Sequence, residues 1–134
     1  MKHLLTLADL DSEAVGKLFS DATRMKFAKR AGETFNVTRF GGRMLGLLFE
    51  KPSLRTRVSF ETAMSHLGGS TIFLGSETGL GERESIEDFA RTLTRYVCAV
   101  VYRGTDHAML EEGVEKLAKV VPFSERSVRD RKKR

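Results

Sequence analysis

The chain has 134 residues, 40% of them hydrophobic, and a formal net charge of +5 at pH 7. This length allows one domain with its own hydrophobic core, but it is short for an enzyme with two substrate-binding lobes. No apolar run approaches the roughly 18 residues needed to cross a bilayer, and the opening MKHLLTLADLDSE becomes acidic too soon for a secretory signal. We therefore expect a cytoplasmic protein with no membrane partner.

The positive charge is concentrated at the carboxyl end. Residues 125–134 contain six basic and two acidic side chains, a net charge of +4, which leaves only +1 for the rest of the chain. The sequence therefore does not indicate a basic domain face for nucleic acid. A solvated tail is the simpler interpretation, because no aromatic residues interleave with its charges. Binding of nucleic acid or an acidic partner through this tail is the alternative.

The first two predicted elements are a helix and a buried strand. Residues 12–31 have apolar side chains at helical spacing, with Asp11 as a candidate cap and Gly32 as a stop. The apolar positions on this predicted helix are Val15, Leu18, Phe19, Ala22 and Met25. The continuous apolar run at 44–49 is typical of a strand that is covered on both faces.

A second helix and strand follow directly. Ser53 is a candidate cap for a helix from about residue 54 to 67, and the glycine pair at 68–69 ends it. Residues 70–75 are predicted to form the second strand. The charged, glycine-rich segment 76–85 is typical of an exposed loop.

The last part of the chain repeats the alternation before the pattern stops. Ser85 and Asp88 have capping-box spacing and open a helix, the apolar run at 96–102 predicts a strand, and residues 108–119 predict a further helix. Cys98, the single cysteine, lies in the predicted strand, so we expect a buried small side chain and no disulfide or cysteine metal site. The alternation predicts an α/β fold in which helices flank a parallel sheet.

Residues 50–61, EKPSLRTRVSFE, place unusual chemistry at the start of a predicted helix. In parallel α/β sheets, ligands bind beyond the carboxyl ends of the strands, where helix N-termini attract anions. Arg55 and Arg103 both follow strand ends, and Ser53 and Thr56 add hydroxyl groups. The alternative is a capped helix with solvated arginines, but arginine in a first turn opposes the helix dipole. Anion binding is therefore favoured.

Three segments carry a family resemblance. FEKPSLRTRVSFE (49–61) resembles the carbamoyl-phosphate signature of the aspartate and ornithine carbamoyltransferases, and LGERESIEDFARTLTRY (80–96) is similar to their mobile loop and following helix. VVYRGTDH (100–107) resembles the strand end that carries a further substrate-binding arginine. The resemblance extends from residue 1 to about 121, and the Glu50-Lys51 pair favours the ornithine branch.

The resemblance implies roles for individual residues. The phosphate of carbamoyl phosphate is expected to bind Ser53, Arg55, Thr56 and the backbone N–H of Leu54, and Arg103 is expected to polarise the carbonyl oxygen. Arg55 and Arg103 are thus the catalytic candidates, and no metal or other cofactor is implied. Arg57 is interpreted as structural. His107 matches a family position, although a helix-capping histidine is the favoured interpretation.

The rest of the family's length is not matched by this sequence. Family members are more than twice as long, and their H-P-x-Q, D-x-x-x-S-M-G and H-C-L-P segments do not occur here. We expect residues 1–122 to form the carbamoyl-phosphate-binding domain, and 123–134 a divergent basic tail.

We therefore expect a truncated ornithine-carbamoyltransferase-like protein that binds carbamoyl phosphate or phosphate in the context of arginine biosynthesis. It is expected to be inactive alone, because the amine substrate has no binding half. One half of a split enzyme is the alternative. By resemblance we also expect a homo-oligomer, a trimer as in the family.

Overall fold

The protein is described by a computed structural model that covers residues 3–33, 40–78 and 84–104, together with parts of 108–115. Its centre is a three-stranded parallel sheet in the order β2-β1-β3. The strands are β1 (Met44–Phe49), β2 (Ser70–Leu74) and β3 (Ala99–Arg103). This arrangement confirms the predicted α/β class.

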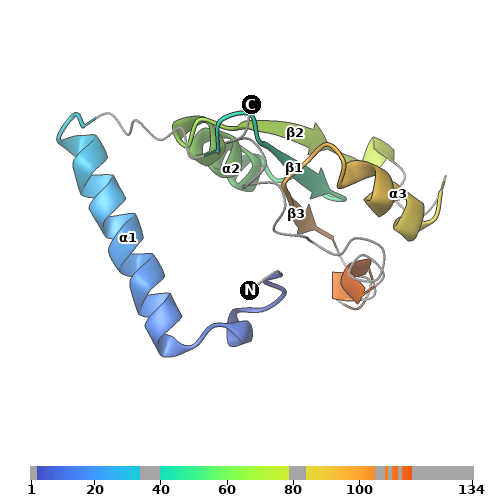
Figure 1. The fold of residues 1–134 in the computed structure, drawn as a ribbon, viewed down its shortest axis with the longest axis horizontal. Helices are drawn as coiled ribbons and strands as arrows, with labels where there is room; N and C mark the ends of the chain where they lie inside the picture. Colours follow the sequence, from blue (N-terminus) through green and yellow to red (C-terminus); the bar gives the residue numbers. More distant parts are fainter. Residues whose placement is uncertain are drawn as a thin grey trace, which may run out of the picture.

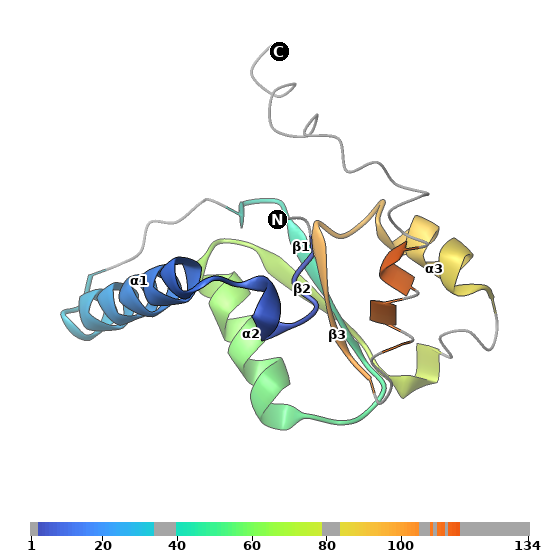
Figure 2. The same cartoon turned by 90° about the horizontal axis from the view of Figure 1, so that it is seen from below.

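Helices lie on both faces of the sheet. The main helices are α1 (Ser12–Arg30), α2 (Leu54–His66) and α3 (Ile86–Leu93), and short 3₁₀ turns form η1 (Leu7–Asp9) and η3 (Ser76–Thr78). Figure 1 labels these elements, and in the view of Figure 2 α2 lies on one side of the sheet and α3 on the other. The sheet is therefore the middle layer, as expected when parallel strands are joined by helices.

Strand β1 forms the core of the molecule. It pairs with a strand on each side, and its residues 45–49 are all buried, with Leu47 at 0% and Phe49 at 1% exposure. The core cluster consists of Leu45, Leu47, Phe49 and Met64, with Phe40, Phe73 and Val101 packed against it. A strand with apolar side chains on both faces needs cover on both faces, as in the middle of a parallel sheet, and this is why the run at 44–49 could be predicted from the sequence.

Helix α2 is held on the sheet by a stacked arginine. The Arg57 guanidinium carbon lies 3.9 Å from the centre of the Phe73 ring, and its Nε donates to Glu61 Oε1 at 2.9 Å. Phe73 in turn meets Phe49 edge-on, with ring centres 5.6 Å apart. Cation–π and edge-to-face contacts each add to simple area burial. Arg57 therefore has a structural role, as predicted.

The glycine pair after α2 allows a tight return to β2. Gly68 has φ 77°, in the left-handed region that favours glycine, and the N–H of Gly69 donates to Met64 O at 2.9 Å. A Cβ at Gly69 would overlap the Met64 methyl group and press on the Arg43 carbonyl. The pair thus ends the helix and lets the chain pass close to the core.

The predicted limits of β3 and β2 and the predicted burial of Cys98 were wrong in detail. The strand begins at Ala99 and not at residue 96, because the N–H groups of Tyr96 and Val97 bond back to Leu93 O at 3.0 and 3.1 Å and continue the turn after α3. Cys98 is only partly buried, since it lies in the bend between that turn and the strand. β3 also includes Arg103 as its last residue, which was predicted to follow the strand, and β2 ends at Leu74, one residue earlier than predicted.

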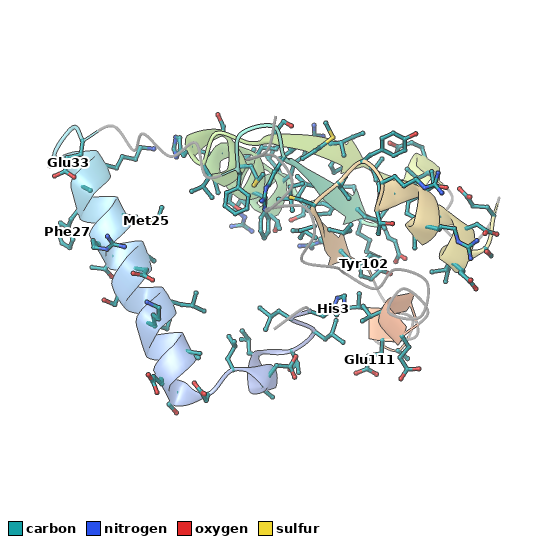
Figure 3. All side chains as sticks on the ribbon, viewed as in Figure 1. His3, Met25, Phe27, Glu33, Tyr102 and Glu111 are labelled. Carbon is teal, nitrogen blue, oxygen red and sulfur yellow. The ribbon has the colours of Figure 1, made fainter. Side chains whose placement is uncertain are left out.

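Helix α1 begins where it was predicted to begin and ends one residue earlier, and it has no buried face. Asp11 caps it, with Oδ1 accepting from Ala14 N–H at 2.7 Å, and Gly32 follows with φ 78°. No residue of α1 is buried, and Phe19 is 72% exposed. Figure 1 shows α1 standing away from the sheet, and Figure 3 shows Met25 and Phe27 on opposite sides of the helix. Its end approaches α2, where Lys29 Nζ lies 3.4 Å from His66 Nε2.

The remaining predictions are tested only in part. Ser85 caps α3, because its Oγ accepts from Asp88 N–H at 3.1 Å and also donates to Asp88 Oδ2 at 2.8 Å. The described residues within 108–115 are helical, in agreement with the predicted helix. Residues 79–83, His107 and everything from 116 onward, including the proposed boundary at 122, lie outside the described residues. Within the described part, no helix is long and apolar enough to cross a bilayer.

A matched pair of leucine variants tests this packing. Leu47 is fully buried and Leu18 is 57% exposed, so Leu47→Ala is expected to lower the free energy of unfolding by about 2–5 kcal/mol. Leu18→Ala is expected to change it by less than about 0.5 kcal/mol. Urea unfolding of both variants measures the difference. An equally large loss from Leu18→Ala would show that α1 is packed in solution.

Candidate functional site

The ends of β1 and β3 bring two distant parts of the chain together. The parallel register pairs Phe49 with Arg103, and the N–H of Glu50 donates to Arg103 O at 2.9 Å. The chain leaving β1 enters α2 at Leu54. The start of α2 and the end of β3 therefore share the carboxyl edge of the sheet, where ligands of parallel α/β folds bind.

Three of the predicted site residues meet at this edge. Ser53 Oγ donates to Thr56 Oγ1 at 2.8 Å, and Arg103 Nη1 approaches the same oxygen at 3.5 Å. The second contact is at the outer limit of a hydrogen bond, so the guanidinium keeps most of its donor capacity. Ser53 and Thr56, which follow β1, thus form one polar cluster with Arg103, the last residue of β3.

The first turn of α2 offers free backbone donors. Its first helical bond runs from Arg57 N–H to Ser53 O at 3.0 Å, so the N–H groups of residues 54–56 have no acceptor within the helix. Ser53 occupies the predicted cap position, but its side chain makes no capping hydrogen bond. The hydroxyl is turned to Thr56 instead. The positive end of the helix is therefore left open to a ligand.

The other two predicted residues lie on the same turn and contact solvent. The Leu54 side chain is 77% exposed, which fits a role for its backbone alone. Arg55 is also exposed, and within the described part of the chain it makes no hydrogen bond or ion pair. The structure does not bring its guanidinium into contact with Thr56 or Arg103.

A carboxylate beside the site was missed by the sequence reasoning. Glu50 follows β1 directly, and its Oε1 accepts a 2.5 Å hydrogen bond from the Tyr102 hydroxyl. Side-chain alternation in β3 places Tyr102 and Arg103 on opposite faces, but no sequence signal indicated the hydrogen bond to Glu50. The cluster of Ser53, Thr56 and Arg103, together with the first turn of α2, combines hydroxyl, guanidinium and backbone donors. This set of donors suits a small phosphate-like anion.

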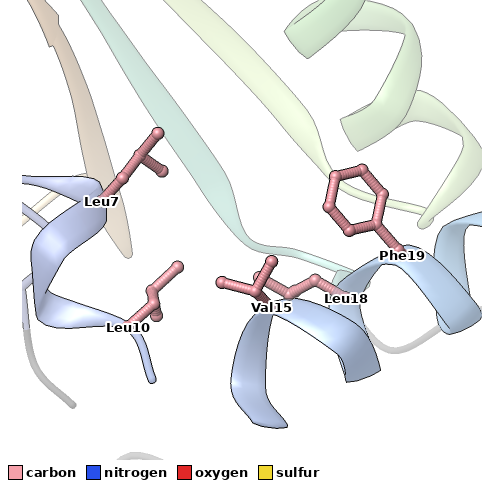
Figure 4. A pocket seen from close by; sticks show the side chains of 5 residues that line it. All are labelled: Leu7, Leu10, Val15, Leu18 and Phe19. Atoms are coloured by element: carbon pink, nitrogen blue, oxygen red, sulfur yellow. The ribbon is translucent and has the colours of Figure 1, made fainter. Parts of the chain in front are cut away.

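The described residues also contain an apolar pocket that is separate from this cluster. It has a volume of about 330 Å³ and lies between η1 and α1 (Figure 4). Its lining residues are Leu7, Leu10, Val15, Leu18 and Phe19. It contributes none of the polar groups described above. Within the described residues, no group of three His, Cys, Asp or Glu side chains could hold a metal ion.

Comparison with known families gives a match over nearly the whole chain. The family described as "Aspartate/ornithine carbamoyltransferase, carbamoyl-P binding domain" matches residues 2–129. The chain is 44% identical over 115 residues to the ornithine carbamoyltransferase of Agrobacterium fabrum, and 42% identical over 113 residues to that of Archaeoglobus fulgidus. These alignments cover 85% and 84% of the chain but only 37% and 36% of the relatives. The chain therefore spans little more than a third of their length.

Solved structures agree with the sequence relatives. The ornithine carbamoyltransferase of Pyrococcus furiosus superposes with a TM-score of 0.77 at 39% identity, covering 90% of this chain and 37% of that one. The mitochondrial enzyme of Coccidioides immitis gives a TM-score of 0.80 at 28% identity, covering 85% and 37%. The predicted resemblance and its fold are thereby confirmed. The chain belongs to the aspartate/ornithine carbamoyltransferase family and corresponds to its carbamoyl-phosphate-binding domain.

Proposed function

We propose that the chain binds carbamoyl phosphate, or inorganic phosphate, at the start of α2. The observation that carries this proposal is the meeting of Ser53, Thr56 and Arg103 beside the open first turn of that helix. The proposal is supported by the family match, whose description names carbamoyl-phosphate binding. An anion at this position neutralises a positive helix end and completes the free hydrogen bonds of residues 54–56.

Each residue of the cluster has a distinct task in this proposal. The backbone N–H groups, the Ser53 and Thr56 hydroxyls and Arg55 hold the phosphate oxygens, with Arg55 turning inward from its exposed position. Arg103 binds the carbonyl oxygen on the β3 side. Carbamoyl transfer places negative charge on that oxygen and on the departing phosphate, so fixed positive donors stabilise the transition state. Arg55 and Arg103 are therefore the proposed catalytic residues.

The complete reaction, carbamoyl transfer to ornithine, is a separate proposal that rests on the relatives. The curated relatives are named ornithine carbamoyltransferases, and the chain spans about 37% of their length. We place the protein in arginine biosynthesis on this basis, as a domain that binds carbamoyl phosphate and does not turn over ornithine by itself. The cluster of Ser53, Thr56 and Arg103 contains no carboxylate, so it supplies no oppositely charged partner for a cationic amine. Assembly into a homo-oligomer stays a prediction from the family.

Two arginines of the same helix provide a matched test of the site. Arg55 makes no hydrogen bond or ion pair within the described residues, whereas Arg57 stacks on Phe73. Arg55→Gln is expected to weaken carbamoyl phosphate binding at least about tenfold, because a charge-assisted hydrogen bond is lost. Arg57→Gln is expected to lower stability and to leave the dissociation constant unchanged within about twofold. Calorimetric titration at fixed ionic strength measures both.

The titration separates three results. Binding by the parent chain that Arg55→Gln alone weakens supports the site. Equal weakening in both variants means that helix packing, not the Arg55 charge, governs affinity. No binding of carbamoyl phosphate or phosphate by the parent chain contradicts the proposed function.

An activity assay tests the second part of the proposal. The 134-residue chain, supplied with carbamoyl phosphate and ornithine, is expected to form no citrulline above the uncatalysed rate. The same chain mixed with a separately produced amine-binding half of a relative provides the comparison. Citrulline from the mixture alone would support the split-enzyme alternative, and citrulline from the isolated chain would contradict the proposal that it is inactive alone.

A further inference from the structure

Helix α1 carries an apolar stripe that the rest of the described structure does not cover. The stripe consists of Val15, Leu18, Ala22 and Met25, which follow one another at steps of three and four residues and so lie along one side of the helix. None of them is buried in the described structure, and Leu18 is 57% exposed. Helices in proteins gain most of their stability by packing such a side against another surface. The stripe is therefore a candidate interaction surface.

The opposite side of α1 satisfies its own charges. Asp21 Oδ2 lies 3.7 Å from Lys17 Nζ, and Asp21 Oδ1 lies 3.2 Å from Arg24 Nη2. These three residues are also spaced by four and three positions, but their spacing places them away from the stripe. The polar side is thus suited to solvent, and the stripe is the side that gains from being covered.

The stripe ends in unlike charges. Asp11 lies four residues before Val15, and Lys29 lies four residues after Met25, so each continues the stripe at one end. Asp11 Oδ1 already accepts the hydrogen bond that caps α1, but a carboxylate has a second oxygen. Lys29 Nζ lies 3.4 Å from His66 Nε2, and an ammonium group has three donors. Both end charges therefore have capacity for a further contact.

The stripe is complementary to itself when two copies of α1 run in opposite directions. A two-fold axis at the middle of the helix sets Val15 of one copy opposite Met25 of the second copy, and Leu18 opposite Ala22. The large Leu18 thus meets a small side chain. Met25, whose flexible side chain fits irregular gaps, meets the apolar pocket that Val15 lines between η1 and α1 (Figure 4).

The end charges favour this direction. In the same antiparallel register, Asp11 of each copy lies opposite Lys29 of the other, so both ends of the pair bring opposite charges together. In a parallel pair each of these charges would face its own copy, which is repulsive. The apolar layers and the charges therefore agree on one arrangement.

We infer that α1 is the interface of an antiparallel homodimer, in which each copy covers the stripe of the other. The inference is independent of the proposed function, because the stripe lies neither at the start of α2 nor at the end of β3. The competing occupant is the additional part of the longer relatives, of which this chain covers 37%. The small effect expected of Leu18→Ala on unfolding applies to the separate chain, at concentrations below the dissociation constant of the pair.

A matched pair of aspartate substitutions tests the surface. Leu18 belongs to the stripe, whereas Phe27, which is 62% exposed, lies on the side of α1 away from Met25 (Figure 3). Sedimentation velocity of the parent chain at increasing concentration is expected to show a monomer–dimer equilibrium. Leu18→Asp is expected to raise its dissociation constant at least about tenfold, because a charge would be covered without a partner, and Phe27→Asp is expected to leave it unchanged within about twofold. Circular dichroism verifies that both variants fold.

Engineered disulfides test the direction of the helices. Chains with Val15→Cys and chains with Met25→Cys, both in a Cys98→Ser background, are expected to cross-link when they are mixed and far less when each is oxidised by itself. The two positions are ten residues apart, about 15 Å along the helix, so they cannot be bridged within one chain. Chains with Val15→Cys that cross-link to one another as efficiently as to chains with Met25→Cys would contradict the antiparallel arrangement.

The outcomes separate this inference from its alternatives and from the proposed function. Association that Leu18→Asp alone weakens, together with cross-linking in the mixture, supports the homodimer. A parent chain that is monomeric at every concentration, or an oligomer that Leu18→Asp does not weaken, overturns the inference and leaves the anion site untouched. If the monomeric parent chain instead binds a separately produced amine-binding half of a relative, and Leu18→Asp removes that binding, the stripe belongs to the second lobe and the homodimer is overturned. Absence of phosphate binding by a chain that does dimerise contradicts the proposed function alone.

Discussion

The parallel register between β1 and β3 is the constraint on which the candidate site depends. Pairing Phe49 with Arg103 places the carboxyl ends of the two strands at the same level. The chain that leaves β1 then starts α2 next to Arg103, and the Thr56 hydroxyl meets the guanidinium. A shift of one residue would turn Arg103 to the opposite face. Because β1 is buried between its neighbours and Leu47 is fully covered, the hydrophobic core fixes this register.

The charged residues near the site are divided between packing and binding. Arg57 is engaged with Phe73 and Glu61 and secures α2 on the sheet. Glu50 is engaged with Tyr102. Arg55, on the same helical turn as Arg57, has no such partner within the described residues. Structural interactions thus occupy Arg57 and Glu50, and the exposed Arg55 guanidinium remains for a ligand on a helix end that already favours negative charge.

The sequence predicted those features that local chemistry determines. The apolar run at 44–49 is typical of a covered strand, Asp11 and Ser85 cap their helices, and the glycines after α2 end it. Features that depend on distant contacts were missed or misjudged. Neither the exposure of α1 nor the Glu50–Tyr102 hydrogen bond follows from periodicity, because each depends on what lies nearby in space. Ser53 was predicted to cap α2, but its hydroxyl donates to Thr56 Oγ1 and makes no capping hydrogen bond.

The central claim is that the first turn of α2 and the end of β3 form a working anion site in this chain. A crystal structure of the protein soaked in phosphate tests it most directly. The account predicts tetrahedral density within hydrogen-bond distance of the N–H groups of residues 54–56 and of the Arg103 guanidinium, with the Arg55 side chain turned toward it. An ordered α2 and β3 with no anion between them, at phosphate concentrations well above the millimolar range, would contradict the account.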